Sequence, residues 1–155
     1  MFIWKTLMLL VLVVWIGGLI FFFFVAAPTA FLVLPTTMLA GNVVARSLAA
    51  LHWIGIVSGV IFLIASLLYS RARFARAKPL MLVNVLVLIM LALTLMSQFA
   101  ITPRVHALRA QLPPPGSAPD AIQMEFNRFH TWSTRVETGV LVLGLGVVLL
   151  TARRF

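Results

Sequence analysis

The 155-residue chain contains no cysteine, and only 10% of its residues are charged. Without cysteine the chain forms no disulfide, thiolate metal site or iron–sulfur cluster, and it has no cysteine nucleophile. The scarcity of charge excludes an ordinary soluble domain, because a soluble fold of this length needs a charged surface. With 63% hydrophobic residues, against roughly 45–50% in soluble domains, the composition predicts an integral membrane protein surrounded by lipid.

Acidic residues are especially scarce, since three of them face twelve lysines and arginines, which gives a net charge of +9. Such a basic balance would also suit a nucleic-acid-binding protein. The basic residues, however, lie at the ends of apolar runs, where positive charge orients membrane helices and meets anionic lipid. We therefore expect the lipid bilayer as the partner of this charge, and no nucleic acid.

Four apolar runs are long enough to cross a bilayer, whose core of about 30 Å needs roughly 20 helical residues. They cover approximately residues 3–26, 47–69, 80–102 and 131–152. This pattern predicts an all-α fold, in which residues 1–155 form a single transmembrane domain built as a four-helix bundle.

The apolar sequence continues beyond the first run but contains Pro28 and Pro35. Proline removes a helix hydrogen bond and either kinks or ends the helix. We expect the first helix to bend at Pro28 and continue to about Leu34. The alternative is a break into a short segment at the membrane surface, where protein or water must satisfy the backbone.

Basic residues predict the orientation of the bundle. One side would carry Lys5, Arg71, Arg73, Arg76, Lys78, Arg153 and Arg154, and the other Arg46, Arg104, Arg109 and Arg128. The first group is denser and lies partly in a very short loop, so the positive-inside rule places both termini in the cytoplasm.

The loop over residues 103–129 would then face outward and has a pattern of its own. Residues 104–112 would extend the third helix until the run from Pro113 to Gly116 stops it. Ser117 or Asp120 would cap a helix that continues into the fourth span. The third and fourth helices would thus form a hairpin that projects roughly two or three turns outside the membrane.

Small residues indicate where helices approach one another closely. Gly55 and Gly59 lie four residues apart on the second helix, Gly17 and Gly18 lie on the first, and Gly139 lies on the fourth. Such positions let two helix backbones come together in a membrane. We expect packing within the bundle, and a homodimer contact is the alternative.

All three histidines fall on the predicted outer side. His52 lies about one and a half turns into the second helix, His130 at the start of the fourth, and His106 just past the end of the third. For His52 and His130, which neighbour tryptophans, the alternative is a place in the interfacial aromatic belt. His106 is equally consistent with a solvated loop.

Glu137 is the only acid within a predicted span, and it shares one helix face with His130 and Ser133. An ionisable residue inside a membrane is costly and therefore indicates a functional site. The alternative for Glu137 is a structural role, in which it neutralises Arg135 or Arg128.

Two neutral histidines on different helices can ligate a haem or a metal ion. We therefore predict a cofactor, either haem b or copper, near the outer face. The ligands would be His52 and His130, joined by His106 for a metal, and the residues that orient them would be Glu137, Gln98 and Ser133.

Several short motifs also point to a family. They are Trp15-Ile16-Gly17-Gly18, Ala27-Pro28-xx-Phe31, Leu34-Pro35, Ala40-Gly41, Ile101-xx-Arg104 and Phe126-xx-Phe129-His130-xx-Ser133. Together they resemble the transmembrane-protein-205-like family, whose bacterial members are catalogued as domain of unknown function 4149. The resemblance covers nearly the whole chain and implies a four-helix protein, which we expect in a bacterial inner membrane.

More distantly, the first helix is similar to those of the copper-resistance protein D family and of the HemJ-type protoporphyrinogen oxidases. These relatives handle copper and haem, and they carry a histidine about two turns before the tryptophan of the Trp-x-Gly-Gly motif. Here that region holds Leu7, Met8 and Leu9. The resemblance therefore does not carry the oxidase activity over to this chain.

Two other functions remain open at this stage. In the first, the protein is a small transporter or permeation element, in which the kinked first helix and Glu137 line a polar path. In the second, it is a non-catalytic scaffold or stress-related protein whose outer hairpin binds a partner. The sequence identifies no substrate and leaves open whether the protein is an enzyme.

Overall fold

A computed structural model of the protein describes residues 2–74, 82–112 and 120–153. These residues form α-helices interrupted by two short π-helices, η1 and η2. In chain order the elements are α1 (Phe2–Phe21), η1 (Phe22–Ala26), α2 (Ala27–Val33), α3 (Thr37–Phe74), α4 (Leu82–Met96), η2 (Ser97–Ile101), α5 (Thr102–Arg109) and α6 (Ala121–Ala152).

Joined end to end, these elements give four helices that are long and apolar enough to cross a membrane. They are Phe2–Val33, Thr37–Ala72, Leu82–Arg109 and Ala121–Ala152. Large apolar side chains such as Leu32, Phe24 and Val142 are exposed on their outer surfaces, as lipid-facing residues are. The predictions of an all-α fold and of a multi-pass membrane protein with four spans are therefore confirmed.

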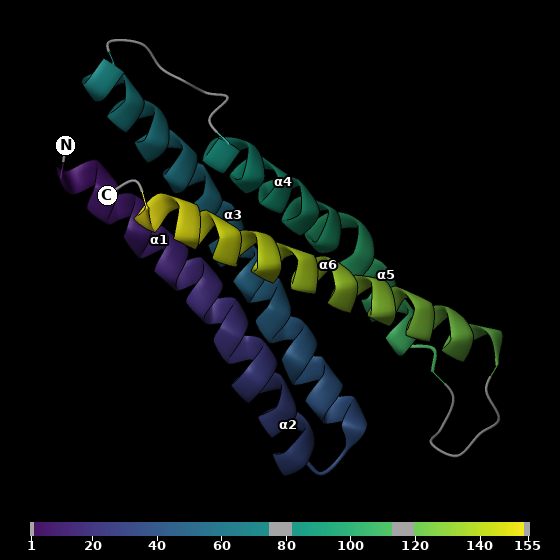
Figure 1. The fold of residues 1–155 in the computed structure, drawn as a ribbon. Helices are drawn as coiled ribbons and strands as arrows, with labels where there is room; N and C mark the ends of the chain where they lie inside the picture. Colours follow the sequence, from purple (N-terminus) through teal and green to yellow (C-terminus); the bar gives the residue numbers. More distant parts are fainter. Residues whose placement is uncertain (1, 75–81, 113–119, 154–155) are drawn as a thin grey trace.

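The helices form two antiparallel pairs that cross (Figure 1). In the first pair α1 and α2 pack against α3, and in the second α4 and α5 pack against α6. Because α3 also contacts α4 and α1 contacts α6, the four helices close into a ring in which α3 and α6 are diagonal. The pairs diverge toward the ends of α2 and α5 (Figure 1), and we call this the forked end.

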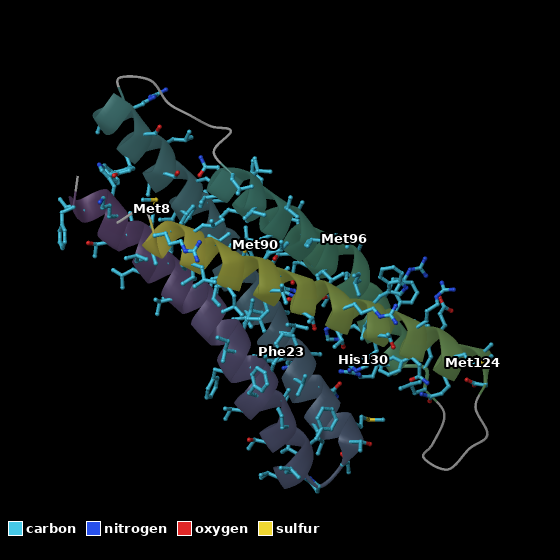
Figure 2. All side chains as sticks on the ribbon, in the orientation of Figure 1. Met8, Phe23, Met90, Met96, Met124 and His130 are labelled. Carbon is cyan, nitrogen blue, oxygen red and sulfur yellow. The ribbon has the colours of Figure 1, made fainter. Side chains whose placement is uncertain are left out.

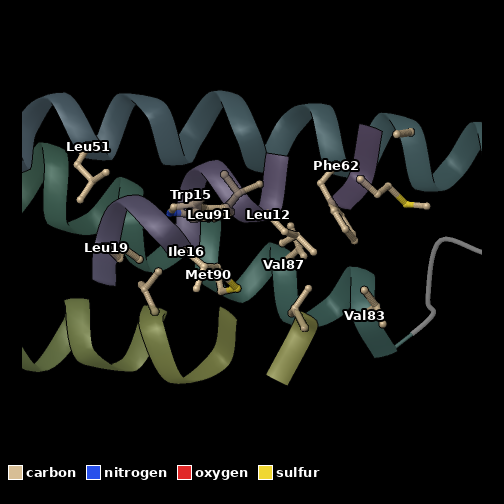
Figure 3. Packing of buried hydrophobic residues seen from close by; sticks show 14 of the residues in the cluster. Leu12, Trp15, Ile16, Leu19, Leu51, Phe62, Val83, Val87, Met90 and Leu91 are labelled. Atoms are coloured by element: carbon tan, nitrogen blue, oxygen red, sulfur yellow. The ribbon is translucent and has the colours of Figure 1, made fainter. Parts of the chain in front are cut away.

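An apolar core fills the bundle between the forked end and the end at which α1 begins. Leu12, Trp15, Phe62 and Val87 are almost completely buried there, and Figure 3 shows these side chains from α1, α3 and α4 in contact. Burial of this apolar surface in a closely packed interior holds the crossing of the two pairs in place.

Glycines admit the largest core side chain. A Cβ atom on Gly55 would lie 2.4 Å from Nε1 of Trp15, and one on Gly59 would lie 3.0 Å from Cζ3 of the same indole. Gly18 is equally tight, because its Cβ would lie 2.8 Å from Leu51. Packing within the bundle is therefore confirmed for these three glycines.

Two other glycines do not have the predicted role. A Cβ on Gly17 or Gly139 would meet nothing within 4 Å, whereas one on Gly144, which was not predicted, would lie 2.0 Å from Ile16. The reason is rotation about the helix axis, since Gly144 is on the inward stripe of α6 and Gly139 is not. A homodimer contact stays a prediction.

Two prolines lie inside continuous helices because a π-helix precedes each of them. A proline ring clashes with the carbonyl group four residues earlier, and these carbonyls belong to Phe24 of η1 and Phe99 of η2. In the wider turn the residue before each proline bonds one position further back, from Ala27 N–H to Phe22 and from Thr102 N–H to Ser97. The predicted continuation of the first helix past Pro28 is confirmed, and it ends at Val33.

Helix α3 starts earlier than predicted, at Thr37 rather than near residue 47. Its first turn is capped by Thr36, whose hydroxyl accepts a hydrogen bond from the backbone N–H of Leu39. The helix therefore begins well before the apolar run over residues 47–69 that predicted it. His52 consequently lies about four turns into α3, so the expected one and a half turns is wrong.

Helix α6 begins at Ala121 and runs unbroken to Ala152, as predicted for a helix that continues into the fourth span, so His130 lies within it and not at its start. Asp120 caps it as predicted, since its carboxylate accepts from Gln123 N–H at 2.8 Å. The alternative cap Ser117, the stop from Pro113 to Gly116, and the basic residues Arg76, Lys78 and Arg154 lie outside the described residues. The orientation of the termini and the projecting hairpin stay predictions.

Candidate functional site

A histidine and a glutamate meet in the middle of the bundle, across its diagonal. Nε2 of His52, on α3, lies 2.7 Å from Oε1 of Glu137, on α6. Each residue is only 1% exposed. An ionisable pair at this depth is costly to bury unless its partners satisfy it, so the contact ties together two helices that do not otherwise pack against each other.

Gln98 completes the arrangement from the π-helix η2. Its Oε1 lies 2.8 Å from Nδ1 of His52. Because a carbonyl oxygen only accepts hydrogen bonds, Nδ1 carries a hydrogen and donates it. The remaining proton of the pair then lies between Nε2 and the Glu137 carboxylate, which makes the pair either an imidazolium–carboxylate or a neutral imidazole–carboxylic acid.

A cavity of about 210 Å³ opens above this pair, between the two helix pairs at the forked end. Most of its lining is apolar, with Phe22, Phe23 and Phe31 from the first helix and Val44, Ala45 and Leu48 from α3. Glu137 lies at its base, and Ser133, His130 and His106 contribute polar groups. Phe23 and His130, labelled in Figure 2, come from opposite helix pairs. We call this space the inner cavity.

A second hollow, of about 330 Å³, lies further toward the forked end. It shares Phe31, Arg109 and His130 with the inner cavity and adds polar residues such as Thr37 and Gln123. We call it the outer groove. The three shared residues mark the boundary between the two spaces.

Arg109 bridges the fork at this boundary. Its guanidinium donates a hydrogen bond to the backbone carbonyl of Gly41 on α3. The same group lies 5.6 Å from the ring centroid of Phe126 on α6, a cation–π distance. His130 stacks on Phe126 with ring centroids 5.9 Å apart. These contacts hold Arg109 and His130 in fixed positions beside one another.

The structure brings together three of the residues selected from the sequence and separates the others. His52, Gln98 and Glu137 are in direct contact. His130 lies seven residues before Glu137 on the same helix, which is about 10 Å along the axis. Together with His106 and Ser133, it lines the inner cavity without a hydrogen bond to the pair among the described residues.

The alternative role of Glu137, in which it neutralises Arg135 or Arg128, is wrong. Arg135 and Arg128 are both exposed, and Arg128 lies over the ring of Phe129. The carboxylate instead bonds to His52. The reason is that Glu137 lies on the inward face of α6, and the nearest cationic or protonatable group there comes from the diagonal helix.

The donor set fits a haem or copper site poorly. Both ring nitrogens of His52 are hydrogen-bonded, to Gln98 and to Glu137, so a metal would have to displace one of these partners. Within the described parts of the chain, no group of three or more histidine and acidic side chains is arranged to hold a metal ion. The prediction of haem b or copper stays a prediction.

Arg109 lines the site, whereas the charge pattern of the sequence predicts only that it lies on the outer side of the bundle. A signal was present, because Val105, Leu108, Arg109 and Leu112 follow the spacing of an apolar helix stripe. An arginine on such a stripe points toward the interior and not toward solvent.

Comparison with known proteins places the chain in a family. A family model described as domain of unknown function 4149 matches residues 10–113, about two thirds of the chain. The protein belongs to the domain of unknown function 4149 family. No protein of curated function and no solved structure matches it.

The part that matches the domain of unknown function 4149 model contains His52, Gln98 and Arg109, whereas His130 and Glu137 lie on α6, beyond it. The family description assigns no chemistry to these residues. The wider resemblance to the transmembrane-protein-205-like, copper-resistance D and HemJ-type proteins stays an expectation. Function therefore has to be argued from the geometry of the site.

Proposed function

We propose that this protein binds a small, largely apolar molecule in the inner cavity, within the membrane. The observation that carries the proposal is the inner cavity itself, whose walls are mainly phenylalanine and aliphatic side chains and whose lining includes Glu137, the partner of the buried His52. An apolar pocket with a few convergent polar groups is the usual form of a small-molecule site.

The polar groups of the cavity give the bound molecule an orientation. Glu137 and Ser133 line one side of the cavity, opposite Phe22 and Phe31 on the first helix. In a site of low dielectric, one hydrogen bond to a fixed partner discriminates strongly between ligands that can form it and ligands that cannot. Because His52 holds Glu137 and Gln98 holds His52, the carboxyl group is positioned before a ligand arrives.

Binding is better supported than permeation. A path through the protein would have to continue from Glu137 toward the start of α1, where Trp15, Phe62 and Val87 fill the interior. A permeation element would need this core to open. The scaffold alternative depended on the outer loop, whose residues 113–119 lie outside the described part of the chain.

A haem or copper function also remains a prediction, and its support is the presence of His52 and His130 at membrane depth. It would require His52 to exchange a hydrogen-bond partner for the metal, as described above. The proposal of an apolar ligand requires no such rearrangement.

Photolabelling tests the proposed function. Benzophenone, a small neutral photoreactive ketone, would be irradiated with the detergent-solubilised protein, and the labelled residues would be mapped by mass spectrometry. We expect labels concentrated in residues 22–31 and 44–48. Ala45→Phe should fill the cavity and reduce this labelling several-fold. Ala50→Phe, the same change on the exposed face of α3, should leave it unchanged.

The opposite outcome is equally clear. If labels spread evenly over exposed apolar residues such as Leu32 and Val142, and Ala45→Phe leaves the pattern unchanged, the cavity does not bind the probe and the proposal is wrong.

A further inference from the structure

Arg109 carries a positive charge that no acidic side chain neutralises in the described part of the chain. The ion pair found there joins His52 and Glu137. A guanidinium has five N–H donors, and the hydrogen bond that Arg109 makes goes to an uncharged carbonyl, that of Gly41. Arg109 is half-buried and lines both the inner cavity and the outer groove.

The position of this charge divides the site into two chemically different parts. The inner cavity is mainly apolar and lies on the side of Phe22, Phe23 and Leu48. The outer groove contains Thr37 and Gln123 and lies on the other side. Arg109 and His130 line both spaces, so a molecule that occupies both must pass directly beside them.

We propose that the ligand is an amphiphile with one narrow apolar chain and an anionic carboxylate head group. The head group binds Arg109 in the outer groove, and the chain occupies the inner cavity. This inference rests on the proposed function and specifies its ligand class. A planar guanidinium matches a carboxylate in a bidentate arrangement, which gives the contact both strength and geometry.

The charges of the site fix the orientation in which the ligand binds. A second carboxylate is disfavoured at the base of the inner cavity, because burying a charge there without a free cation to pair with it is costly. A cationic ligand is disfavoured by Arg109 at the boundary, and the charge of Glu137 is already matched by His52. The arrangement therefore selects an anionic head outside and an apolar chain inside.

The size of the inner cavity limits the ligand to a single chain. Its volume of about 210 Å³ is below the range of roughly 300–1,000 Å³ that drug-sized ligands occupy. A phospholipid with two acyl chains would have to place one of them elsewhere. A fatty acid with one chain fits the apolar space more closely.

Competition with benzophenone labelling tests this inference. Decanoate and decanol have the same chain and differ in charge at pH 8, so their ability to displace the probe isolates the contribution of the head group. We expect decanoate to compete about tenfold more strongly than decanol with the unmodified protein, a difference of about 1.4 kcal/mol. Arg109→Gln should abolish this preference, whereas Arg104→Gln, on the exposed face of the same helix, should preserve it.

Each outcome is informative. Equal competition by decanoate and decanol, with the probe still mapped to the cavity, overturns the anionic ligand and leaves the proposed function standing. Stronger competition by a two-chain anionic phospholipid than by decanoate overturns the single-chain assignment. Absence of cavity labelling overturns both proposals.

Loss of structure in the Arg109→Gln variant would be recognised from the loss of benzophenone labelling itself. In that case Arg109→Lys decides the question, because it retains the charge without the bidentate geometry. We expect it to keep the labelling and part of the decanoate preference. A reduced preference in this variant, beside an intact preference in Arg104→Gln, supports the bidentate contact, and a full preference contradicts it.

Discussion

Replacing His52 and Glu137 separately and together provides a quantitative test of the buried pair. The variants are His52→Leu, Glu137→Leu and the double variant, in which leucine occupies a similar volume without a polar group. Each single replacement leaves the other residue buried without its partner, which costs about 1–3 kcal/mol for a polar group. The double replacement removes both polar groups, and such exchanges are often close to neutral.

The structure sets the expected coupling energy between the two residues. Their hydrogen bond is 2.7 Å long and both are 1% exposed, so solvent does not replace a lost partner. Hydrogen bonds between membrane helices average about 0.6 kcal/mol and reach about 1.7 kcal/mol. A pair with this geometry and charge belongs at the upper end, and we expect a coupling of at least about 1 kcal/mol.

The assay is reversible unfolding of the purified protein in mixed micelles, with the free energy of unfolding taken from the denaturing-detergent titration. The control is His52→Leu combined with Thr138→Ala, because the Thr138 hydroxyl bonds within its own helix, to the Thr134 carbonyl. This control cycle should be additive within about 0.5 kcal/mol. Equal additivity for His52 and Glu137 would refute the pairing on which the site is built.

The remaining predictions concern the core, the π-helix, the cofactor and the topology. Gly55→Ala should lower the free energy of unfolding by about 1–3 kcal/mol through overpacking. Gly17→Ala places a methyl group that meets nothing within 4 Å, so it should change this free energy by less than about 0.5 kcal/mol. A larger loss of stability in Gly17→Ala than in Gly55→Ala would contradict the packing. Pro103→Ala should allow η2 to return to a regular helix and so weaken the hydrogen bond between Gln98 and the His52 imidazole. The measurement is the ¹⁵N NMR signal of that ring, which should shift. An unshifted signal would show that the proline does not maintain η2. An ultraviolet–visible spectrum and metal analysis of the purified protein test haem b and copper, and a Soret band or stoichiometric copper that disappears on replacing the predicted histidine ligands would establish a cofactor. The cysteine-free chain also allows single cysteines near either terminus, which a membrane-impermeant thiol reagent should label only from the cytoplasmic side; labelling from outside would reverse the predicted orientation.

The four spans were predictable because each is an apolar run long enough for a bilayer, and lipid leaves the backbone no alternative to a helix. The helix ends were less predictable. The Asp120 cap of α6 was predictable from its residue type, whereas α3 continues beyond the start of the predicted span to a cap at Thr36, which hydropathy does not register. As a result, the depth of His52 was misjudged.

The contacts of the site depend on features that no single helix contains. His52 and Glu137 belong to the diagonal helices α3 and α6, so their contact depends on how all four helices pack. The π-helix that carries Gln98 adds a residue to one turn and rotates the following side chains relative to a regular helix. Sequence spacing assumes regular helices, so it selected His52, Gln98 and Glu137 as members of one site but not the separation of His130 from them.

The inner cavity is the central claim, and chemical modification of one position inside it tests the claim most directly. Because the chain has no cysteine, Ala45→Cys provides a single thiol in the cavity wall and Ala50→Cys a matched thiol on the exposed face. The measurement is the rate at which a small neutral thiol reagent modifies each variant, with and without decanoate. We expect decanoate to slow modification several-fold in Ala45→Cys and to have no effect in Ala50→Cys. Equal rates in both variants, unchanged by decanoate, would contradict a ligand-binding cavity at this position.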